Sequence, residues 1–181
     1  MNKCIFLDRD GTINVDVSYL KYPEDLKLIE GSAQAIKLFH EDGFKVIVVT
    51  NQSGVARGYF TEDDVGRVNS HLSSLLKEKG TYIDDVFYCP HYEQGKVKEY
   101  SIDCSCRKPK PGMVFSAAQK YDLDLSACFV IGDKESDIQL GRTAGCKTVL
   151  VLTGDGKKYA DKTAADFIAE DLLDAYNKIK K

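Results

Sequence analysis

The chain has 181 residues, of which 43% are hydrophobic and 29% are charged, proportions typical of a globular protein. Its net charge of −3 gives no general attraction for nucleic acid, and no apolar stretch reaches the roughly 20 residues that cross a bilayer. The length suits a single domain over residues 1–181. The N-terminus leads directly into an apolar run without room for a signal peptide, so we expect a cytoplasmic protein.

Short apolar runs alternate along the chain with segments of helical character. The predicted strands are residues 4–7, 45–50, 85–89, 128–132, 148–152 and, more weakly marked, 166–169. The predicted helices are residues 32–42, 62–79, 112–121, 136–144 and 172–180. This alternation favours an α/β fold with a doubly wound, mostly parallel sheet and helices on both faces. Ligands of such folds bind beyond the carboxyl ends of the strands, where we expect the irregular stretches 14–29, 51–60 and 90–111.

The first predicted strand is followed at once by Asp8-Arg9-Asp10-Gly11-Thr12. Side chains alternate along an extended chain, so Asp8 and Asp10 can leave its end on the same side. Two carboxylates in apolar surroundings repel each other, and a hard cation such as Mg²⁺ relieves that repulsion. The alternative is an ordinary turn, because Asp and Gly favour turns.

Three later strands also end in polar residues. The segment Thr50-Asn51-Gln52-Ser53-Gly54 offers hydroxyls, amides and backbone donors to a phosphate, or it is a polar turn. Arg107 and Lys108 precede two prolines that stiffen the chain, so we expect them to point into the site rather than form a solvated charge run. Asp133 follows the fourth strand, and Asp137 lies one helical turn later, where an acid also favours the helix dipole.

The third strand leads into a loop, residues 89–110, that is rich in cysteine. Cys89-Pro90-His91 is separated by twelve residues from Cys104-Ser105-Cys106. Three thiols and an imidazole suit tetrahedral Zn²⁺, and four protein ligands leave no open position, so we expect a structural zinc. The alternative is three free thiols beside a surface histidine. The loop leads directly into the two basic residues after Cys106, so zinc is expected to fix their position.

In this order the motifs resemble the haloacid dehalogenase (HAD) superfamily of phosphatases. The resemblance rests on Asp8-x-Asp10-Gly11-Thr12, Thr50, Lys108 and Gly132-Asp133-x3-Asp137, and it spans nearly the whole chain. It implies Asp8 as the nucleophile that forms an aspartyl-phosphate, and Asp10 as the general acid and base. It implies that Thr50 and Lys108 stabilise the transferring phosphoryl oxygens. The implied Mg²⁺ ligands are Asp8, Asp10 through its backbone carbonyl, Asp133 and Lys134.

The chain leaves little room for the large cap domain of many superfamily members, so loops must select the substrate. Relatives with a zinc loop include the histidinol-phosphate phosphatases and the heptose-bisphosphate phosphatases. The segment Ser53-Gly54-Val55-Ala56-Arg57-Gly58 is more similar to the heptose enzymes. The resemblance therefore implies removal of the 7-phosphate of D-glycero-D-manno-heptose 1,7-bisphosphate, in nucleotide-activated heptose or lipopolysaccharide core biosynthesis.

A bisphosphate needs positive charge at both ends. With Lys108 at the reacting phosphate, Arg107 and Arg57 are expected to hold the distal one through bidentate bonds. Val17 and Ser18 depart from the family's usual residues. The resemblance implies as substrate-binding residues Asp16, Val17, Ser18, Tyr19, Asn51, Gln52, Ser53, Arg57, Arg107 and Lys134.

Two alternatives remain open from the sequence. A histidinol-phosphate phosphatase would share the machinery but would favour an acidic residue where this chain has Arg57 and Arg107. A nucleic-acid module would use the zinc loop with Arg107-Lys108-x-Lys110, and a polynucleotide 3′-phosphatase would need a longer basic groove. We expect a small phosphorylated sugar as the partner, with no nucleic acid and no membrane, and a monomeric enzyme.

Overall fold

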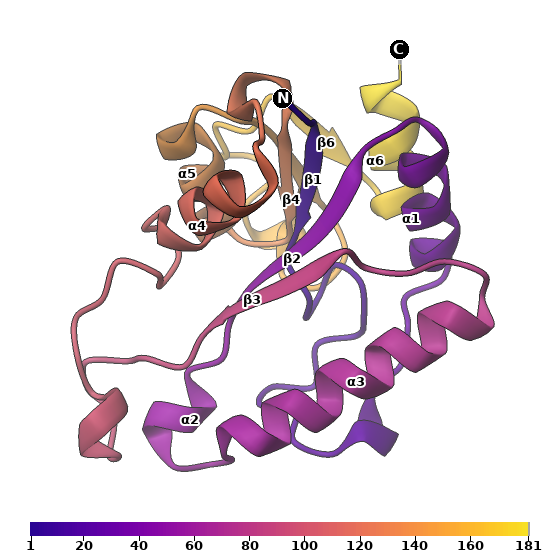
Figure 1. The fold of residues 1–181 in the computed structure, drawn as a ribbon. Coiled ribbons are helices and arrows are strands. Elements are labelled where there is room, and N and C mark those ends of the chain that lie inside the picture. Colours follow the sequence, from indigo (N-terminus) through magenta and orange to yellow (C-terminus); the bar gives the residue numbers. More distant parts are fainter. Residues whose placement is uncertain (181) are drawn as a thin grey trace.

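The computed structural model describes residues 1–180, and its centre is a six-stranded sheet in the order β3-β2-β1-β4-β5-β6 (Figure 1). All neighbouring strands pair in parallel, which confirms the predicted α/β fold. The strands are β1 (Cys4–Leu7), β2 (Lys45–Asn51), β3 (Asp85–Cys89), β4 (Phe129–Gly132), β5 (Lys147–Val151) and β6 (Phe167–Ala169).

The chain reverses its direction of travel across the sheet at β1. It runs from β1 outward through β2 to β3, then returns to β4 on the other side of β1 and continues outward to β6. Ile5 is therefore in register with Val46 on one side and Phe129 on the other. The carboxyl end of β1 lies at this topological switch point, where doubly wound folds bind their ligands.

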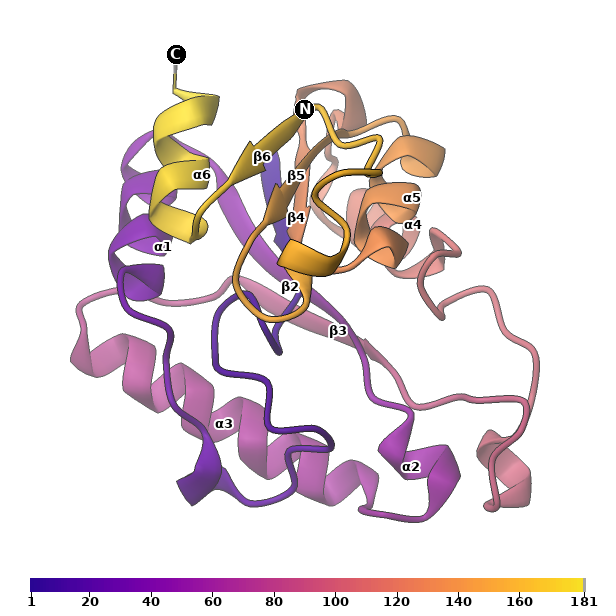
Figure 2. The ribbon, with the colours of Figure 1, turned by 180° about the vertical axis from the view of Figure 1, so that it is seen from behind.

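Helices cover both faces of the sheet (Figures 1 and 2). Helices α4 (Gly112–Tyr121) and α5 (Glu135–Ala144) pack on one face, and α1 (Ser32–Glu41), α3 (Glu62–Glu78) and α6 (Leu172–Ile179) pack on the other. The shorter helical elements are α2 (Gly54–Arg57), η1 (Pro23–Asp25), η2 (Lys98–Tyr100), η3 (Leu125–Ala127) and η4 (Gly156–Lys158).

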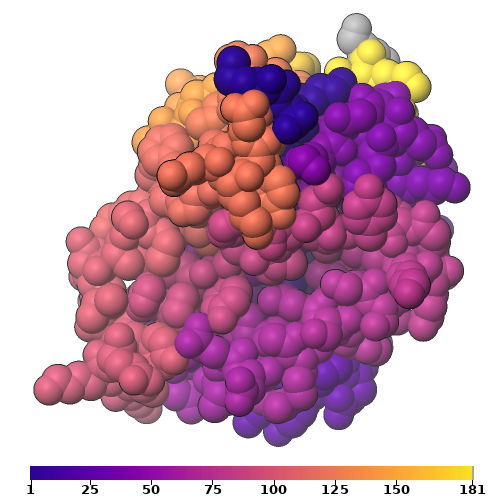
Figure 3. Space-filling model, in the orientation of Figure 1, coloured from indigo at the N-terminus to yellow at the C-terminus, as the bar shows by residue number. Residues whose placement is uncertain are grey.

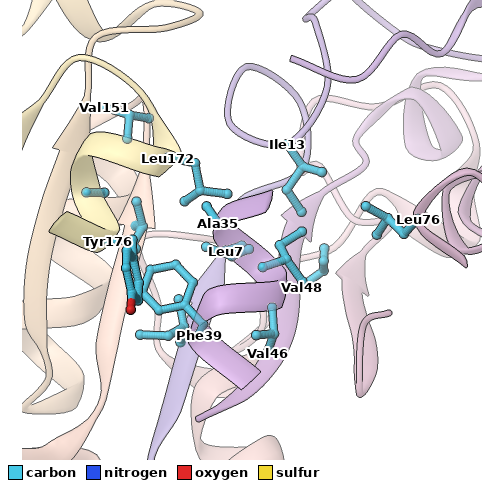
Figure 4. Close-up of a cluster of buried hydrophobic side chains, with 14 of the residues drawn as sticks. Leu7, Ile13, Ala35, Phe39, Val46, Val48, Leu76, Val151, Leu172 and Tyr176 are labelled. Atoms are coloured by element: carbon cyan, nitrogen blue, oxygen red, sulfur yellow. The ribbon is translucent and has the colours of Figure 1, made fainter. Parts of the chain in front are cut away.

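Apolar side chains from the strands and from α1 and α6 form the larger core (Figure 4). Leu7 and Val48 from the sheet meet Phe39 of α1, whose ring lies edge-on to Tyr176 of α6 with 5.3 Å between centroids. All four residues of β1 are fully buried, which explains why its sequence is a continuous apolar run rather than an alternating one.

Every predicted strand and helix is present, with ends within one residue of the prediction. The sequence did not predict α2, which lies within the stretch 51–60 that we expected to be irregular. No helix in residues 1–180 is long and apolar enough to span a membrane.

Candidate active site

Lys108 and two carboxylates meet at the carboxyl end of β1. The Lys108 ammonium lies 3.0 Å from Asp8 Oδ1 and 2.6 Å from Asp137 Oδ1, and it donates a hydrogen bond to the Val49 carbonyl at 2.9 Å. All three charged residues are at most 5% exposed. Burial alone would lower the pKa of Lys108, but the charges of Asp137 and Asp8 outweigh it and raise that pKa. The ammonium is therefore held charged beside Asp8.

Asp133 brings a third carboxylate to the same place. One oxygen each of Asp8, Asp133 and Asp137 lies within 4.8 Å of the others. Burial and the charge of Asp8 raise the pKa of Asp133 to about 7. Asp133 Oδ1 is buried and has no hydrogen-bond partner among residues 1–180. Because buried polar atoms are normally satisfied, this oxygen and its neighbours suit a hard divalent cation.

Asp10 is held by donors on both of its oxygens. Arg9 binds it through Nε at 3.3 Å and Nη2 at 2.9 Å, while Asn14 Nδ2 donates to Oδ1 at 2.9 Å and Gln52 Nε2 to Oδ2 at 3.0 Å. Arg9 is fully buried, and its Nη1 donates to Asn69 Oδ1 of α3 at 2.8 Å. Burial alone would raise the pKa of Asp10, but the Arg9 charge and these hydrogen bonds lower it. The substrate-free site thus holds Asp10 as a carboxylate.

The loop after β5 forms hydrogen bonds to the segments that follow β1 and β4. The Thr153 hydroxyl donates to the Gly11 carbonyl at 2.6 Å, and the Asp155 N–H donates to Asp133 Oδ2 at 2.8 Å. Gly11 has a φ of +86°, and a side chain there would collide with the Asp133 carboxylate. Only glycine therefore fits this turn without strain.

The end of β2 provides the predicted phosphate-binding segment. Thr50 is buried, and its hydroxyl accepts a hydrogen bond from Gln52 Nε2 at 3.0 Å. The Asn51 side chain spans the backbone of Lys108, accepting from its N–H at 3.0 Å and donating to its carbonyl at 3.2 Å. The amides of Asn51 and Gln52 thus position neighbouring groups of the site as well as lining it.

A cavity of about 420 Å³ opens over these groups. The four residues predicted to be catalytic, Asp8, Asp10, Thr50 and Lys108, all line it. The predicted substrate-binding residues in its wall are Asp16, Ser18, Tyr19, Asn51, Gln52, Ser53, Arg107 and Lys134.

Two predicted substrate-binding residues lie outside this wall. Val17 is 45% exposed and does not line the cavity, whereas its neighbours Ser18 and Tyr19 do. Arg57 stacks on the ring of Tyr92, 4.0 Å from its centroid, so its guanidinium is already engaged by the protein.

Lys134 lines the cavity between Asp16 and the carboxylate cluster. Burial alone would lower its pKa, but the charges of Asp133, Asp8 and Asp16 raise it. Its ammonium lies 3.2 Å from Asp16 Oδ2, and the Asp16 Oδ1 atom accepts a hydrogen bond from the Ser18 N–H at 2.8 Å. An ammonium cannot ligate a cation, so the predicted metal contact of Lys134 is limited to its backbone carbonyl. Ser18 and Tyr19 both have positive φ, at 52° and 55°, a strained backbone conformation of the kind found at binding sites.

Cys89, His91, Cys104 and Cys106 come together as predicted. Their sulfur and nitrogen atoms all lie within 4.8 Å of one another, and the three sulfurs are 3.1–3.6 Å apart. A tetrahedral zinc with Zn–S bonds of about 2.3 Å places its sulfurs roughly 3.8 Å apart. The three sulfurs would therefore have to move apart only slightly to bind the ion. None of the six cysteines forms a disulfide.

The loop that carries this cluster lies beside α2, at the lower left of the face shown in Figure 3. The N–H groups of Lys96 and Val97 donate to the Ala56 carbonyl at 2.7 and 2.9 Å. Arg107 Nη1 donates to the His91 carbonyl at 3.2 Å. The residue that follows the last cysteine is thus tied to the backbone of the histidine in the cluster.

Comparison with known proteins agrees with this geometry. The family model described as HAD-hydrolase-like matches residues 105–175. The D-glycero-beta-D-manno-heptose-1,7-bisphosphate 7-phosphatase of Pasteurella multocida (strain Pm70) is 41% identical over 181 residues, 99% of this chain and 98% of its own. The enzyme of that name from Escherichia coli (strain K12) is also 41% identical, over 98% of this chain and 93% of its own.

The chain belongs to the heptose-bisphosphate phosphatase family of HAD hydrolases. It is therefore a phosphoric monoester hydrolase. A family member from Photorhabdus laumondii, 44% identical over 84% of this chain, is named for the alpha rather than the beta anomer of the bisphosphate.

Solved structures of the family share the fold. The D,D-heptose 1,7-bisphosphate phosphatase of B. bronchiseptica, complexed with magnesium and phosphate, superposes with a TM-score of 0.87 at 34% identity, covering 99% of this chain and 98% of its own. The enzyme from Burkholderia thailandensis gives a TM-score of 0.75 at 28% identity, covering 99% of both chains.

Several residues that support this active site were not predicted from the sequence. Arg9, Asn14 and Asn69 form the hydrogen-bond network around Asp10, and Thr153 and Asp155 support the turn and the third carboxylate. The one local signal was Arg9 itself, a charged residue between two aspartates at the end of a buried strand.

Proposed function

We propose that this enzyme hydrolyses the 7-phosphate of D-glycero-D-manno-heptose 1,7-bisphosphate and leaves heptose 1-phosphate. The observation that carries the proposal is the buried Lys108 ammonium, 3.0 Å from Asp8, in a cavity that Arg107 also lines. One cation serves the reacting phosphate, and the other is placed for a second phosphate on the same sugar. Relatives named for both anomers of the bisphosphate have similar identity to this chain, so the proposal covers either anomer.

Asp8 is proposed as the nucleophile. One of its carboxylate oxygens attacks phosphorus while the bond from phosphorus to the sugar O7 breaks, which gives an aspartyl-phosphate. Lys108 and the Thr50 hydroxyl stabilise the charge on the transferring phosphoryl oxygens. Because Lys108 is also paired with Asp137, its ammonium stays in place when the Asp8 charge is consumed.

Asp10 is proposed as the general acid and base. It gives a proton to the leaving O7, then takes a proton from the water that attacks the phosphorus of the Asp8 acyl phosphate. That attack releases inorganic phosphate and restores the Asp8 carboxylate, and Asp10 becomes a carboxylate again when its proton leaves with the phosphate. Since the substrate-free site holds Asp10 as a carboxylate, we infer that the proton arrives with the substrate. A phosphate monoester retains a second proton with a pKa of about 6.

Mg²⁺ is the metal that fits the carboxylate cluster. Asp8 and Asp133 would hold it with their side chains, and Asp10 and Lys134 through backbone carbonyls. The unpartnered Asp133 Oδ1 and the all-oxygen donor set support this choice. When bound, the ion neutralises charge shared between the nucleophile and the phosphate.

Zn²⁺ fits the second cluster, with Cys89, His91, Cys104 and Cys106 as its four ligands. We propose a structural role, because this set leaves no open position. The ion would order the loop and, through the His91 carbonyl, the guanidinium of Arg107. Zinc thiolate sites persist in reducing compartments, which supports a cytoplasmic location.

We further propose that residues 1–181 act as one domain and as a monomer on a small phosphorylated sugar, without a nucleic-acid or membrane partner. Support for a small substrate rather than nucleic acid comes from the size of the cavity, about 420 Å³, and from the net charge of −3. The product keeps its anomeric phosphate, the group that a nucleotidyl transfer consumes in making a nucleotide-activated heptose. Light scattering in solution tests the monomer.

A substrate panel tests the proposed function. Initial rates are compared for heptose 1,7-bisphosphate, histidinol phosphate and an oligonucleotide with a 3′-phosphate, each with Mg²⁺. We expect kcat/KM for the bisphosphate to exceed the others by at least about tenfold, since one charge-assisted contact to the distal phosphate is worth about 1.5–3 kcal/mol. A preference for histidinol phosphate or the oligonucleotide would overturn the substrate assignment.

A further inference from the structure

Two guanidinium groups share one aromatic ring at the edge of the cavity. The central carbon of Arg57 lies 4.0 Å from the centroid of the Tyr92 ring, and that of Arg107 lies 5.1 Å from it. Tyr92 follows His91 in the cysteine-rich loop, and Arg57 ends helix α2. The ring therefore connects two segments that are far apart in the sequence.

The two arginines differ in what they can reach. Arg107 lines the cavity, whereas Arg57 is not part of its wall. Arg57 Nε is buried and has no hydrogen-bond partner among the residues that the structure describes. Arg57 instead lies over the ring of Tyr92, with which its side chain also shares a hydrogen bond, and 5.8 Å from the ring of Tyr19. Because Arg57 lies outside the cavity wall and contacts the ring that Arg107 also contacts, it is placed to support that ring.

Arg107 itself has few constraints besides this ring. Its one hydrogen bond to the protein that we identify runs from Nη1 to the His91 carbonyl at 3.2 Å. One such bond fixes a single point on a long side chain with several rotatable bonds. Contact with the face of Tyr92 adds a second constraint and so defines the plane of the guanidinium. Bidentate recognition of a phosphate needs that plane to be defined.

We propose that Tyr92 is a positioning residue that orients Arg107 toward the phosphate that is not cleaved, and that Arg57 braces Tyr92 from α2. The inference rests on the proposed function for its substrate, and it revises the role of Arg57 from phosphate ligand to support. Tyr19, which lines the cavity and packs edge-on against Tyr59 at 4.7 Å, connects the same group to the 16–19 loop.

The kinetic test compares Tyr92→Ala with Tyr92→Phe, which keeps the ring. Tyr92→Ala should raise KM for heptose 1,7-bisphosphate about 3- to 10-fold with little change in kcat, and leave hydrolysis of a hexose 6-phosphate unchanged. Tyr92→Phe should behave as wild type. Tyr82→Ala is the matched control, because Tyr82 is exposed and stacks on His40 before β3. Equal losses on both substrates, or failure of phenylalanine to rescue, would overturn the inference.

A double mutant decides whether Tyr92 acts through Arg107. In the Arg107→Ala background, Tyr92→Ala should cause no further loss on the bisphosphate. If the double mutant instead loses the product of the two single-mutant losses in kcat/KM, Tyr92 acts on the substrate independently of Arg107, and the positioning role is refuted.

A third measurement does not depend on the substrate. The ¹⁵N relaxation of Arg107 Nε should report a restricted side chain in the wild type and in Tyr92→Phe, and a mobile one in Tyr92→Ala. Unchanged mobility in Tyr92→Ala refutes the inference whatever the enzyme hydrolyses. The two proposals can also fail separately. If the wild type does not prefer the bisphosphate but Tyr92→Ala still makes Arg107 mobile, the proposed function is wrong and the positioning role of Tyr92 stands.

Discussion

Arg9 donates a hydrogen bond to each carboxylate oxygen of Asp10, from Nε to Oδ1 at 3.3 Å and from Nη2 to Oδ2 at 2.9 Å. The guanidinium is in turn fixed by Asn69 of α3, whose Oδ1 accepts from Nη1 at 2.8 Å. Asn69, which follows Arg9 by 60 residues in the sequence, thus helps to fix the arginine that orients Asp10, the proposed general acid and base.

Asn69→Ala should weaken catalysis in a way that depends on the leaving group. A sugar hydroxyl leaves only if it is protonated, so we expect kcat for a sugar phosphate to fall about 3- to 10-fold. Hydrolysis of p-nitrophenyl phosphate, whose leaving group needs little protonation, should change by less than about twofold. Ser73→Ala, one turn further along α3, is the control. Equal losses on both substrates would show that Asn69 serves the fold rather than Asp10.

Asp8→Asn should abolish turnover and preserve the fold. Asparagine has nearly the same shape but is not a nucleophile toward phosphorus, so activity should fall below detection while circular dichroism stays unchanged. Asp10→Asn should retain the nucleophile and lose roughly two to four powers of ten. A folded Asp8→Asn protein with near-normal activity would refute covalent catalysis.

The zinc proposal predicts one metal ion per chain. Cys104→Ser should lose the metal, expose residues 90–111 to proteolysis and reduce activity through Arg107. Cys146→Ser is the matched control, because Cys146 belongs to the apolar core and not to the metal-binding group. Elemental analysis of freshly purified protein reads out both variants. Equal zinc contents in Cys104→Ser and wild type would refute the ligand set.

Magnesium affinity should depend on pH. Burial, with the charge of Asp8, raises the pKa of Asp133 to about 7, above the roughly 3.9 of an unfolded aspartate. The folded metal-free protein therefore binds this proton more tightly than the unfolded chain does, and it should lose stability as the pH rises from about 4 to 7. Mg²⁺ must displace the proton. Calorimetry should show affinity about tenfold weaker at pH 6 than at pH 8, and equal affinities would contradict the assignment.

The sequence predicted most of the fold because the strands are apolar on both faces. Runs such as Cys4–Leu7 are short, continuous and bounded by polar residues, so their ends could be placed to within a residue. Asp8 and Thr50 lie at those ends, and Lys108 was predicted from the prolines that stiffen its segment and from the family motif. The structure brings all three to one cavity.

Contacts between distant segments could not be predicted in this way. The pairing of Arg9 with Asn69 depends on how α3 crosses the sheet, and no local pattern encodes it. The charge and family motif of Arg57 predict phosphate binding, but they could not show that its guanidinium lies over the ring of Tyr92. Helix α2 has only four residues, too few to show a helical periodicity.

The most direct test of the central claim follows the two phosphates of one substrate. With Mg²⁺ and heptose 1,7-bisphosphate, ³¹P NMR distinguishes the 7-phosphate on a CH₂ carbon from the 1-phosphate on the anomeric carbon. The account predicts that inorganic phosphate grows at the expense of the 7-phosphate signal while the 1-phosphate signal persists. Loss of the 1-phosphate signal, or no turnover by the Mg²⁺-loaded protein, would contradict it.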